Sequence, residues 1–237
     1  MTDTLATSKK VGAWEFSDAV VAEFDDHVRS SVAGYDTIQD VIARLSDWAA
    51  PDRAAILDVG CSTGTTLKAI QGRHPNRALA LYGIDKSADM IRAASKKLGP
   101  GATLYADDVL AAEVKLPDSI DLTIAVLTLQ FLPPDRRAGV LSELRRRSKE
   151  TGVLVVAEKT IPADPRWALI CAEASWEDKR IAGFSGDEIV AKAESLRGVL
   201  RPLREQDAIL EPTLAGWGAP QVLWAAWNWR LVAYFAS

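Results

Sequence analysis

The 237 residues are 48% hydrophobic and 25% charged, which is typical of a globular protein, and we expect a single domain over residues 1–237. The formal net charge of −4 argues against a broadly basic surface for nucleic acid. The sequence has no apolar run long enough to span a membrane and no signal-peptide core, so we expect a cytoplasmic protein. The two cysteines do not have the spacing of metal ligands, so we expect no structural metal.

The N-terminal part carries two apolar stripes with helical spacing, after a segment at residues 1–12 that we expect to be flexible. The first stripe runs through residues 13–35. The second begins near Thr37 and stops at Pro51. The pattern predicts N-terminal helices over residues 13–50.

Short apolar runs then alternate with helical stretches. The predicted strands are 55–59, 79–84, 103–106, 120–127 and 152–157, and the helices between them include 88–98 and 135–147. Two helices at about 165–180 and 186–200 form a predicted insertion over residues 160–205 that covers the active site, before strands 222–227 and 229–235. This alternation predicts an α/β fold, a Rossmann-like doubly wound seven-stranded sheet, mostly parallel with an antiparallel last strand.

A glycine turn, Asp58-Val59-Gly60-Cys61-Ser62-Thr63-Gly64, follows the first of these strands and precedes a helix. Glycines there permit unusual dihedrals and let a ligand approach the backbone. Ser62 occupies the position of the second glycine in the dinucleotide fingerprint, so NAD is disfavoured.

Acidic residues end the next two strands as well. Asp85 lies 21 residues after Gly64, which suits a carboxylate that binds ribose hydroxyls. Asp108 follows the third strand and could accept a hydrogen bond from an adenine amino group while Val109 packs on the ring. Because the carboxyl ends of parallel strands meet at one edge, these positions predict a nucleotide site.

The order D-V-G-C-S-T-G, G-I-D, A-D-D-V and I-A-V-L-T-L-Q-F resembles the class I S-adenosylmethionine (SAM)-dependent methyltransferases. The segments A-W-E-F-S-D-A-V-V-A-E-F, S-V-A-G-Y, L-T-L-Q-F-L and A-E-K narrow the likeness to the carboxy-SAM synthase family, over about residues 13–200. That family uses SAM and prephenate to make the cofactor for a wobble-uridine modification in tRNA.

The resemblance implies a set of cofactor-binding positions, together with the glycine turn: Tyr35, Asp58, Gly60, Cys61, Ser62, Gly64, Asp85, Lys86, Asp108, Val109 and Val126. Three positions depart from the family pattern. Val126 stands where the family has Asn, Lys86 replaces a small polar residue, and Ala193 stands where an Arg binds the extra carboxylate. Ala cannot form that charge-assisted pair, and Arg197 lies one helical turn further along.

Other candidates carry two readings each. Asp85 either binds ribose or caps the following helix, and Tyr35 is either a cofactor contact or a core aromatic. His27 is either a surface histidine or a general base, with Tyr35 the other candidate for a catalytic role. The predicted substrate contacts are Trp14, Gln130, Trp167 and Arg197. The tryptophans of the second half either wall the pocket or fill the core.

The sequence thus predicts a SAM-dependent methyltransferase that acts on a small, biosynthetic acceptor. Two alternatives stay open: carboxy-SAM synthesis, and a non-catalytic SAM-binding partner subunit. The resemblance also implies a homodimer.

Overall fold

A computed structural model describes residues 18–111 and 116–237, except for the side chains at positions 18–20 and 22. The segment predicted to be flexible, residues 1–12, and the predicted substrate contact Trp14 lie outside the described residues.

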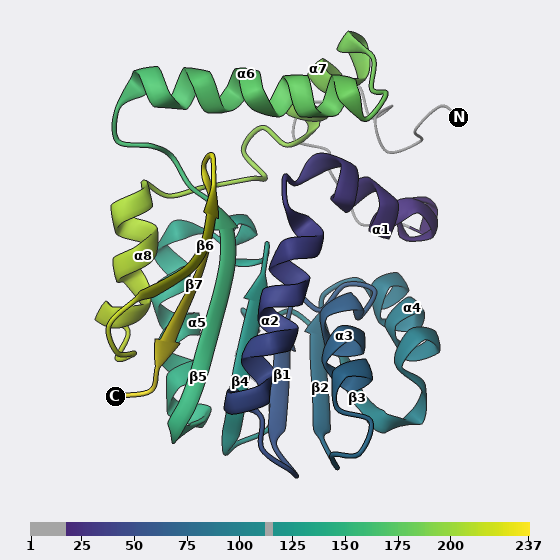
Figure 1. Ribbon diagram of the computed structural model, residues 1–237, viewed down its shortest axis with the longest axis vertical. Coiled ribbons are helices and arrows are strands. Elements are labelled where there is room, and N and C mark those ends of the chain that lie inside the picture. Colours follow the sequence, from purple (N-terminus) through teal and green to yellow (C-terminus); the bar gives the residue numbers. More distant parts are fainter. Residues whose placement is uncertain (1–17, 112–115) are drawn as a thin grey trace.

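Seven strands form one sheet in the spatial order β3-β2-β1-β4-β5-β7-β6 (Figure 1). The strands are β1 (Ala55–Val59), β2 (Ala80–Asp85), β3 (Ala102–Ala106), β4 (Ile120–Val126), β5 (Ser148–Lys159), β6 (Gln221–Ala226) and β7 (Trp229–Phe235). Strands β1 to β5 pair in parallel, and β7 runs antiparallel to both of its neighbours. The predicted seven-stranded, mostly parallel sheet with an antiparallel last strand is confirmed.

Side chains alternate between the two faces of the sheet, and each face is covered by helices. On one face, Ile56, Ile124 and Val155 belong to the core formed with α2 (Tyr35–Ala49), α3 (Thr65–Arg73) and α4 (Ala88–Leu98). On the other face, Leu57 and Leu154 pack with α5 (Pro134–Arg147). Figure 1 shows α2, α3 and α4 in front of the sheet and α5 behind it. The strand order reverses between β1 and β4, where open sheets of this kind bind ligands.

Three helices lie over the end of the sheet that faces up in Figure 1: α1 (Asp18–Ser31), α6 (Pro165–Ile181) and α7 (Gly186–Ser195). The side chain of Asp164 accepts from the Arg166 amide to start α6, and Ser185 with Glu188 forms a capping box at α7. Helices α6 and α7 occupy the segment that was predicted as an insertion, residues 160–205.

The N-terminal helices differ from the prediction at their junction. The structure ends α1 at Ser31 and begins α2 at Tyr35, with Gly34 between them at φ 73°. A Cβ at Gly34 would lie 2.9 Å from Cη2 of Trp224, so this corner packs closely against β6. The close approach explains why a glycine turns the chain here.

A helix that the sequence reading missed, α8 (Glu205–Leu214), packs beside α5 and β7. It contains Pro212, which removes a backbone donor, and its apolar residues do not form a clear stripe. Tertiary packing thus stabilises a helix that the apolar pattern of its own sequence does not predict.

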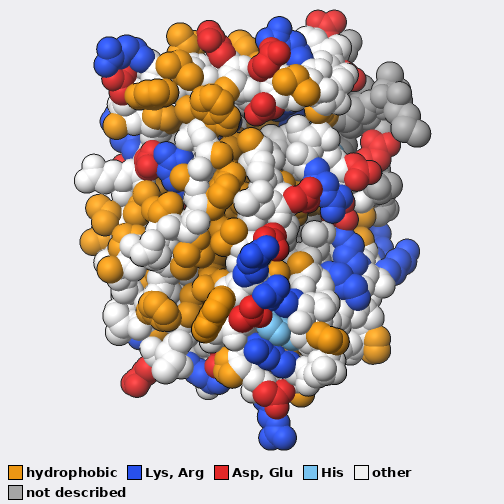
Figure 2. Space-filling view, viewed as in Figure 1, with side chains coloured by type: hydrophobic (Ala, Val, Ile, Leu, Met, Phe, Trp, Pro, Cys, Tyr) orange, Lys and Arg blue, Asp and Glu red, His pale blue; other side chains and the backbone are white. Residues whose placement is uncertain are grey.

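The surface in Figure 2 carries hydrophobic side chains over α6 and over β6. Trp167, Leu169 and Trp176 of α6 and Val222 of β6 are exposed. Within residues 18–111 and 116–237, no helix combines the length and apolar character that a membrane crossing requires. The same residues contain no group of three or more His, Cys, Asp or Glu side chains that could hold a metal ion.

Candidate functional site

A cavity of about 710 Å³ opens at the carboxyl ends of β1 to β5, beneath α1, α6 and α7. Its volume is in the range of small-molecule and cofactor sites. The predicted cofactor residues that line it are Tyr35, Asp58, Gly60, Cys61, Ser62, Asp85, Lys86, Asp108, Val109 and Val126.

The glycine turn forms one wall of the cavity. Gly60 has φ 72°, and a Cβ there would lie 2.6 Å from Cγ2 of Thr128. The Thr128 hydroxyl donates to the Val59 carbonyl at 2.7 Å and so ties the end of β4 to the turn. Ser62 and Leu127, which also line the cavity, have φ 49° and 57°. Side-chain-bearing residues held in this region are strained, and such strain is frequent at binding sites.

Asp85 holds the turn and the start of α4 at once. Its carboxylate accepts hydrogen bonds from the backbone amides of Ser62 at 3.0 Å and Ser87 at 2.9 Å. Burial raises its pKa above the usual range. The capping reading is therefore partly right, but the side chain also lines the cavity and each of its oxygens retains a second lone pair for a ligand hydroxyl.

Asp58 lies one strand away at the end of β1 and is 2% exposed. Burial, with a smaller contribution from the charge of Asp85, raises the pKa of Asp58 to about 7. A buried carboxylate in a cavity wall gains most from a cationic partner, because a nearby positive charge favours its ionised form.

The third acidic position follows β3. Asp107 and Asp108 both line the cavity, and the Asp108 carboxylate accepts from the Leu110 amide at 2.9 Å. Val109 lies beside them in the lining. The three acidic strand ends are thus brought together as the sequence predicted.

An ionic cluster that the sequence reading missed connects α1 to the glycine turn. Asp25 accepts from the hydroxyls of Thr63 at 2.6 Å and Thr65 at 3.1 Å, and Lys97 of α4 contacts it at 2.6 Å. Burial would raise the pKa of Asp25, but the hydrogen bonds from Lys97 and Thr63 outweigh it and hold the pKa below its usual value. This Asp25 cluster fixes α1 over the cavity.

His27 lies on α1, above the cavity, and Tyr35 begins α2. His27 is 6% exposed, so the surface reading is wrong, and its Nε2 contacts the Lys192 ammonium of α7. Tyr35 is buried, and burial with the nearby charges of Asp25 and Asp58 raises its pKa. Both line the cavity, which leaves a catalytic role for either as a prediction. Cys61 is buried and burial raises the pKa of its thiol, which disfavours a nucleophilic thiolate.

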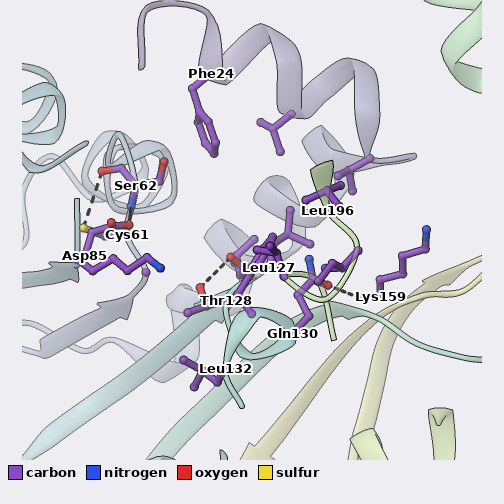
Figure 3. A pocket seen from close by; sticks show the side chains of 18 of the residues that line it. Phe24, Cys61, Ser62, Asp85, Leu127, Thr128, Gln130, Leu132, Lys159 and Leu196 are labelled. Carbon is purple, nitrogen blue, oxygen red and sulfur yellow. Dashed lines mark hydrogen bonds between the residues drawn. The ribbon is translucent and has the colours of Figure 1, made fainter. Parts of the chain in front are cut away.

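The opposite end of the cavity is cationic. Lys159 ends β5, and Lys179 and Lys192 enter from α6 and α7. Gln130 is buried there and accepts from the Lys159 backbone amide at 2.7 Å. Figure 3 shows Asp85 and Ser62 on one side of the cavity and Lys159 on the other. The sequence reading assigned none of these lysines a role.

Some of the remaining predicted residues line the cavity and others lie outside it. Gln130 and Arg197 line the cavity, whereas Trp167 is 57% exposed and does not, so its position gives no support to a substrate contact. Gly64 caps α3 at φ 78° just outside the lining. Ala193 is exposed and lies outside the lining too. Of the tryptophans, Trp229 lines the cavity and Trp217 lies in the core, so both readings of the aromatic load hold in part.

Comparisons with known proteins place this site in context. A family model described as a methyltransferase domain matches residues 56–152, which contain the glycine turn and the acidic strand ends. Carboxy-S-adenosyl-L-methionine synthase from Chromohalobacter salexigens is 33% identical over 195 residues, which cover 81% of this chain and 72% of that protein.

Solved structures share the fold at lower identity. An O-methyltransferase family protein from Burkholderia thailandensis superposes with a TM-score of 0.68 at 18% identity, covering 94% of this chain and 61% of that one. The structure of PigF with SAH gives a TM-score of 0.65 at 18% identity, covering 92% of this chain and 59% of the other. The chain therefore spans about 60% of these two structures.

Proposed function

Because this chain belongs to the class I SAM-dependent methyltransferases, as a relative of the carboxy-SAM synthases, we propose that it transfers the methyl group of SAM to a small-molecule acceptor. The observation that carries the proposal is the shape of the site. One roofed cavity of about 710 Å³ extends from the acidic strand ends to the space beneath α6 and α7. A volume of this kind suits a cofactor together with a small second molecule.

The residues at the acidic end fit SAM. Gly60 lines the cavity and has no side chain, so its backbone atoms can meet the ligand. Asp85 would hold the ribose hydroxyls, Asp108 and Val109 the adenine, and Asp58 the α-ammonium group. Its carboxylate, with a pKa raised to about 7, gains a cationic partner in this way.

When bound, SAM supplies a methyl group on a positively charged sulfur that departs as a neutral thioether. The protein therefore has to orient the acceptor and exclude water, and a strong acid–base pair is not required. The roof formed by α1, α6 and α7 serves exclusion, and the Asp25 cluster keeps α1 in place. His27 and Tyr35 are the candidates for accepting a proton from the acceptor.

The test measures cofactor binding first and turnover second. Asp85→Asn keeps the shape but removes the charge, and we expect SAM affinity to fall about 10- to 100-fold in calorimetry, as for other lost charge-assisted hydrogen bonds. Asp26→Asn is the matched control, because this carboxylate is exposed on α1. Labelled SAM is then incubated with phenol, amine and carbanion acceptors, and methylated product is identified by mass spectrometry. SAM binding with no turnover on any acceptor would favour a non-catalytic subunit instead.

Carboxy-SAM synthesis is the second candidate, favoured by the 33% identity to a synthase over most of both chains. The Arg that the resemblance assigns to the extra carboxylate is Ala193 here, and that position does not line the cavity. Mass spectrometry of the ligand that copurifies, and of products formed from SAM and prephenate, separates the two. A carboxylated sulfonium in either sample would replace methyl transfer by carboxy-SAM synthesis.

A further inference from the structure

Apart from Lys86, the charged side chains that the strand ends contribute to the cavity are separated by sign along the sheet. The acidic residues Asp58 and Asp85 lie at the carboxyl ends of β1 and β2, while Lys159 ends β5 and Lys179 reaches in from α6. With neighbouring strands about 4.8 Å apart, the end of β5 lies about 10 Å from the end of β1, across β4. Figure 3 shows this separation between Asp85 and Lys159.

The two lysines at this end line the same cavity, and the charge of Lys159 acts on Lys179. Lys159 Nζ lies 5.6 Å from the centre of the Trp229 ring, and no carboxylate within the described residues pairs with it. Lys179 Nζ donates to the Ser175 hydroxyl at 3.2 Å. Burial lowers the pKa of both lysines, and for Lys179 the charge of Lys159 adds to this and outweighs the attraction of Asp178, giving a pKa of about 8.

Two half-buried ammonium groups side by side are unfavourable unless an anion joins them, because each loses hydration and repels the other. The third lysine is already engaged, since Lys192 contacts His27 and the hydroxyl of Ser31 at 2.7 Å. Lys159 and Lys179 therefore have the character of a binding site in which a ligand supplies the negative charge.

We propose that Lys159 and Lys179 bind a carboxylate carried by the methyl acceptor. This inference rests on the proposed function, which leaves the cationic end of the cavity to the acceptor. The Trp229 ring beside Lys159 favours an aromatic or otherwise planar acid, since such a group packs on an aromatic face while its carboxylate meets the ammonium.

The carboxylate of SAM itself is the competing occupant. Its α-carboxylate and α-ammonium groups are on the same carbon, so a cofactor whose ammonium lies at Asp58 keeps its carboxylate near β1. The lysine pair lies two strands further along the sheet. The acceptor, not the cofactor, is the molecule that reaches it.

The first experiment measures binding and needs no turnover. With the protein saturated by S-adenosylhomocysteine, 4-hydroxybenzoate and 4-hydroxycinnamate are titrated by calorimetry beside their methyl esters. We expect each acid to bind about 10- to 100-fold more tightly than its ester, as for a charge-assisted contact. The preference is lost in Lys159→Met and Lys179→Met, retained in Lys179→Arg, and unchanged in Lys68→Met, an exposed lysine of α3. Acids that bind no better than their esters, or do not bind, would overturn the proposal.

The second experiment distinguishes the sources of the carboxylate. SAM affinity is expected to change less than twofold in the two methionine variants, which also shows that they are folded. A tenfold loss would assign the lysines to the cofactor and overturn the inference. If the protein prefers the acids but transfers no methyl group, the carboxylate site stands and the proposed function fails. If it methylates neutral acceptors and shows no preference for the acids, the proposed function stands and the carboxylate site fails.

Discussion

Burial and the charge of Asp85 raise the pKa of the Asp58 carboxylate to about 7, so this group titrates near neutral pH. Binding of a cationic ammonium group requires the ionised form, and below pH 7 the proton must first be lost. We expect SAM affinity to rise about tenfold between pH 6 and pH 8, since each pH unit below the pKa costs up to a factor of ten. Calorimetry over this range measures the slope.

Asp58→Asn is the control for this pH dependence, because the amide has nearly the same shape and does not titrate in this range. We expect weaker binding and a flat pH profile. An unchanged slope in this variant would assign the titration to another group.

Gly60 is the residue at which backbone conformation limits the site most directly. Gly60→Ala places a Cβ at φ 72° within 2.6 Å of Thr128, so we expect a loss of about 1–3 kcal/mol of stability together with SAM affinity. Gly139→Ala in α5 meets no atom within 4 Å and has a helical backbone, so it should stabilise the protein by up to about 1 kcal/mol. Thermal unfolding compares the two. A Gly60→Ala protein as stable as wild type would contradict the expectation.

At the scale of elements, a buried ion-pair triad fastens α5 to β5 and α8. Arg137 is fully buried and contacts Glu158 through two nitrogens at 3.0 Å and Glu211 at 2.7 Å. Arg137→Met leaves the buried Glu158 carboxylate unpaired, so we expect a loss of about 3–5 kcal/mol in the free energy of unfolding. Denaturant titration measures this, with exposed Arg136→Met as the control.

The same variant has a predictable pH response. Burial already raises the pKa of Glu158, and the Arg137 guanidinium counteracts this effect. Without the guanidinium, the pKa of Glu158 is higher still. The folded form then holds a proton that the unfolded form releases, so stability falls as pH rises above the unfolded value. The deficit of Arg137→Met should therefore be smaller at pH 5 than at pH 8. A deficit that does not change with pH would rule out an unpaired carboxylate as its cause.

The Asp25 cluster joins α1 to the glycine turn and to α4. Asp25→Asn weakens its contact with Lys97 but keeps the side-chain volume. We expect SAM to dissociate about 5- to 10-fold faster, because the loss of one partly exposed charged hydrogen bond is worth about 1 kcal/mol. Stopped-flow fluorescence measures the rate. Asp26→Asn on the exposed face of α1 should leave it unchanged, and equal effects in both variants would argue against the cluster.

The elements that the sequence predicts well are those with a clear apolar period. Buried runs such as residues 55–59 and 120–127 identify strands without tertiary information. By contrast, α8 contains Pro212 and owes its form to packing on α5 and β7. The apolar stripes do indicate a break between the first two helices near Gly34, but the packing that requires a glycine there involves a distant residue, Trp224.

The candidate site divides in the same way. Acidic residues at the carboxyl ends of β1, β2 and β3 were predictable, because parallel strands end at one edge. Lys159 ends β5 at that same edge, so the rule, extended to this strand, would have indicated it. Lys179 resembles an ordinary cation near a helix C-terminus, and only the folded chain brings it to Lys159.

For the molecule as a whole, cofactor binding should appear as thermal stabilisation. A ligand at 100 times its dissociation constant that binds only the folded state adds about 2.7 kcal/mol. For a domain of this size, that corresponds to a rise in Tm of roughly 5–11 °C. Scanning calorimetry with SAM measures the shift, and Asp85→Asn should reduce it at the same SAM concentration. No shift would count against SAM as the ligand.

The position of β7 has a consequence for how the chain reaches its native state. Residues 229–235 lie between β5 and β6 and pair with both, and Leu231, Val232 and Tyr234 are buried. During synthesis, β5 therefore presents an unpaired edge until these residues have left the ribosome. The sheet is thus completed only after the chain beyond β5 has been made as far as β7. A ribosome that stalls before residue 229 would hold a nascent chain with an open, apolar strand, which is the form that chaperones bind.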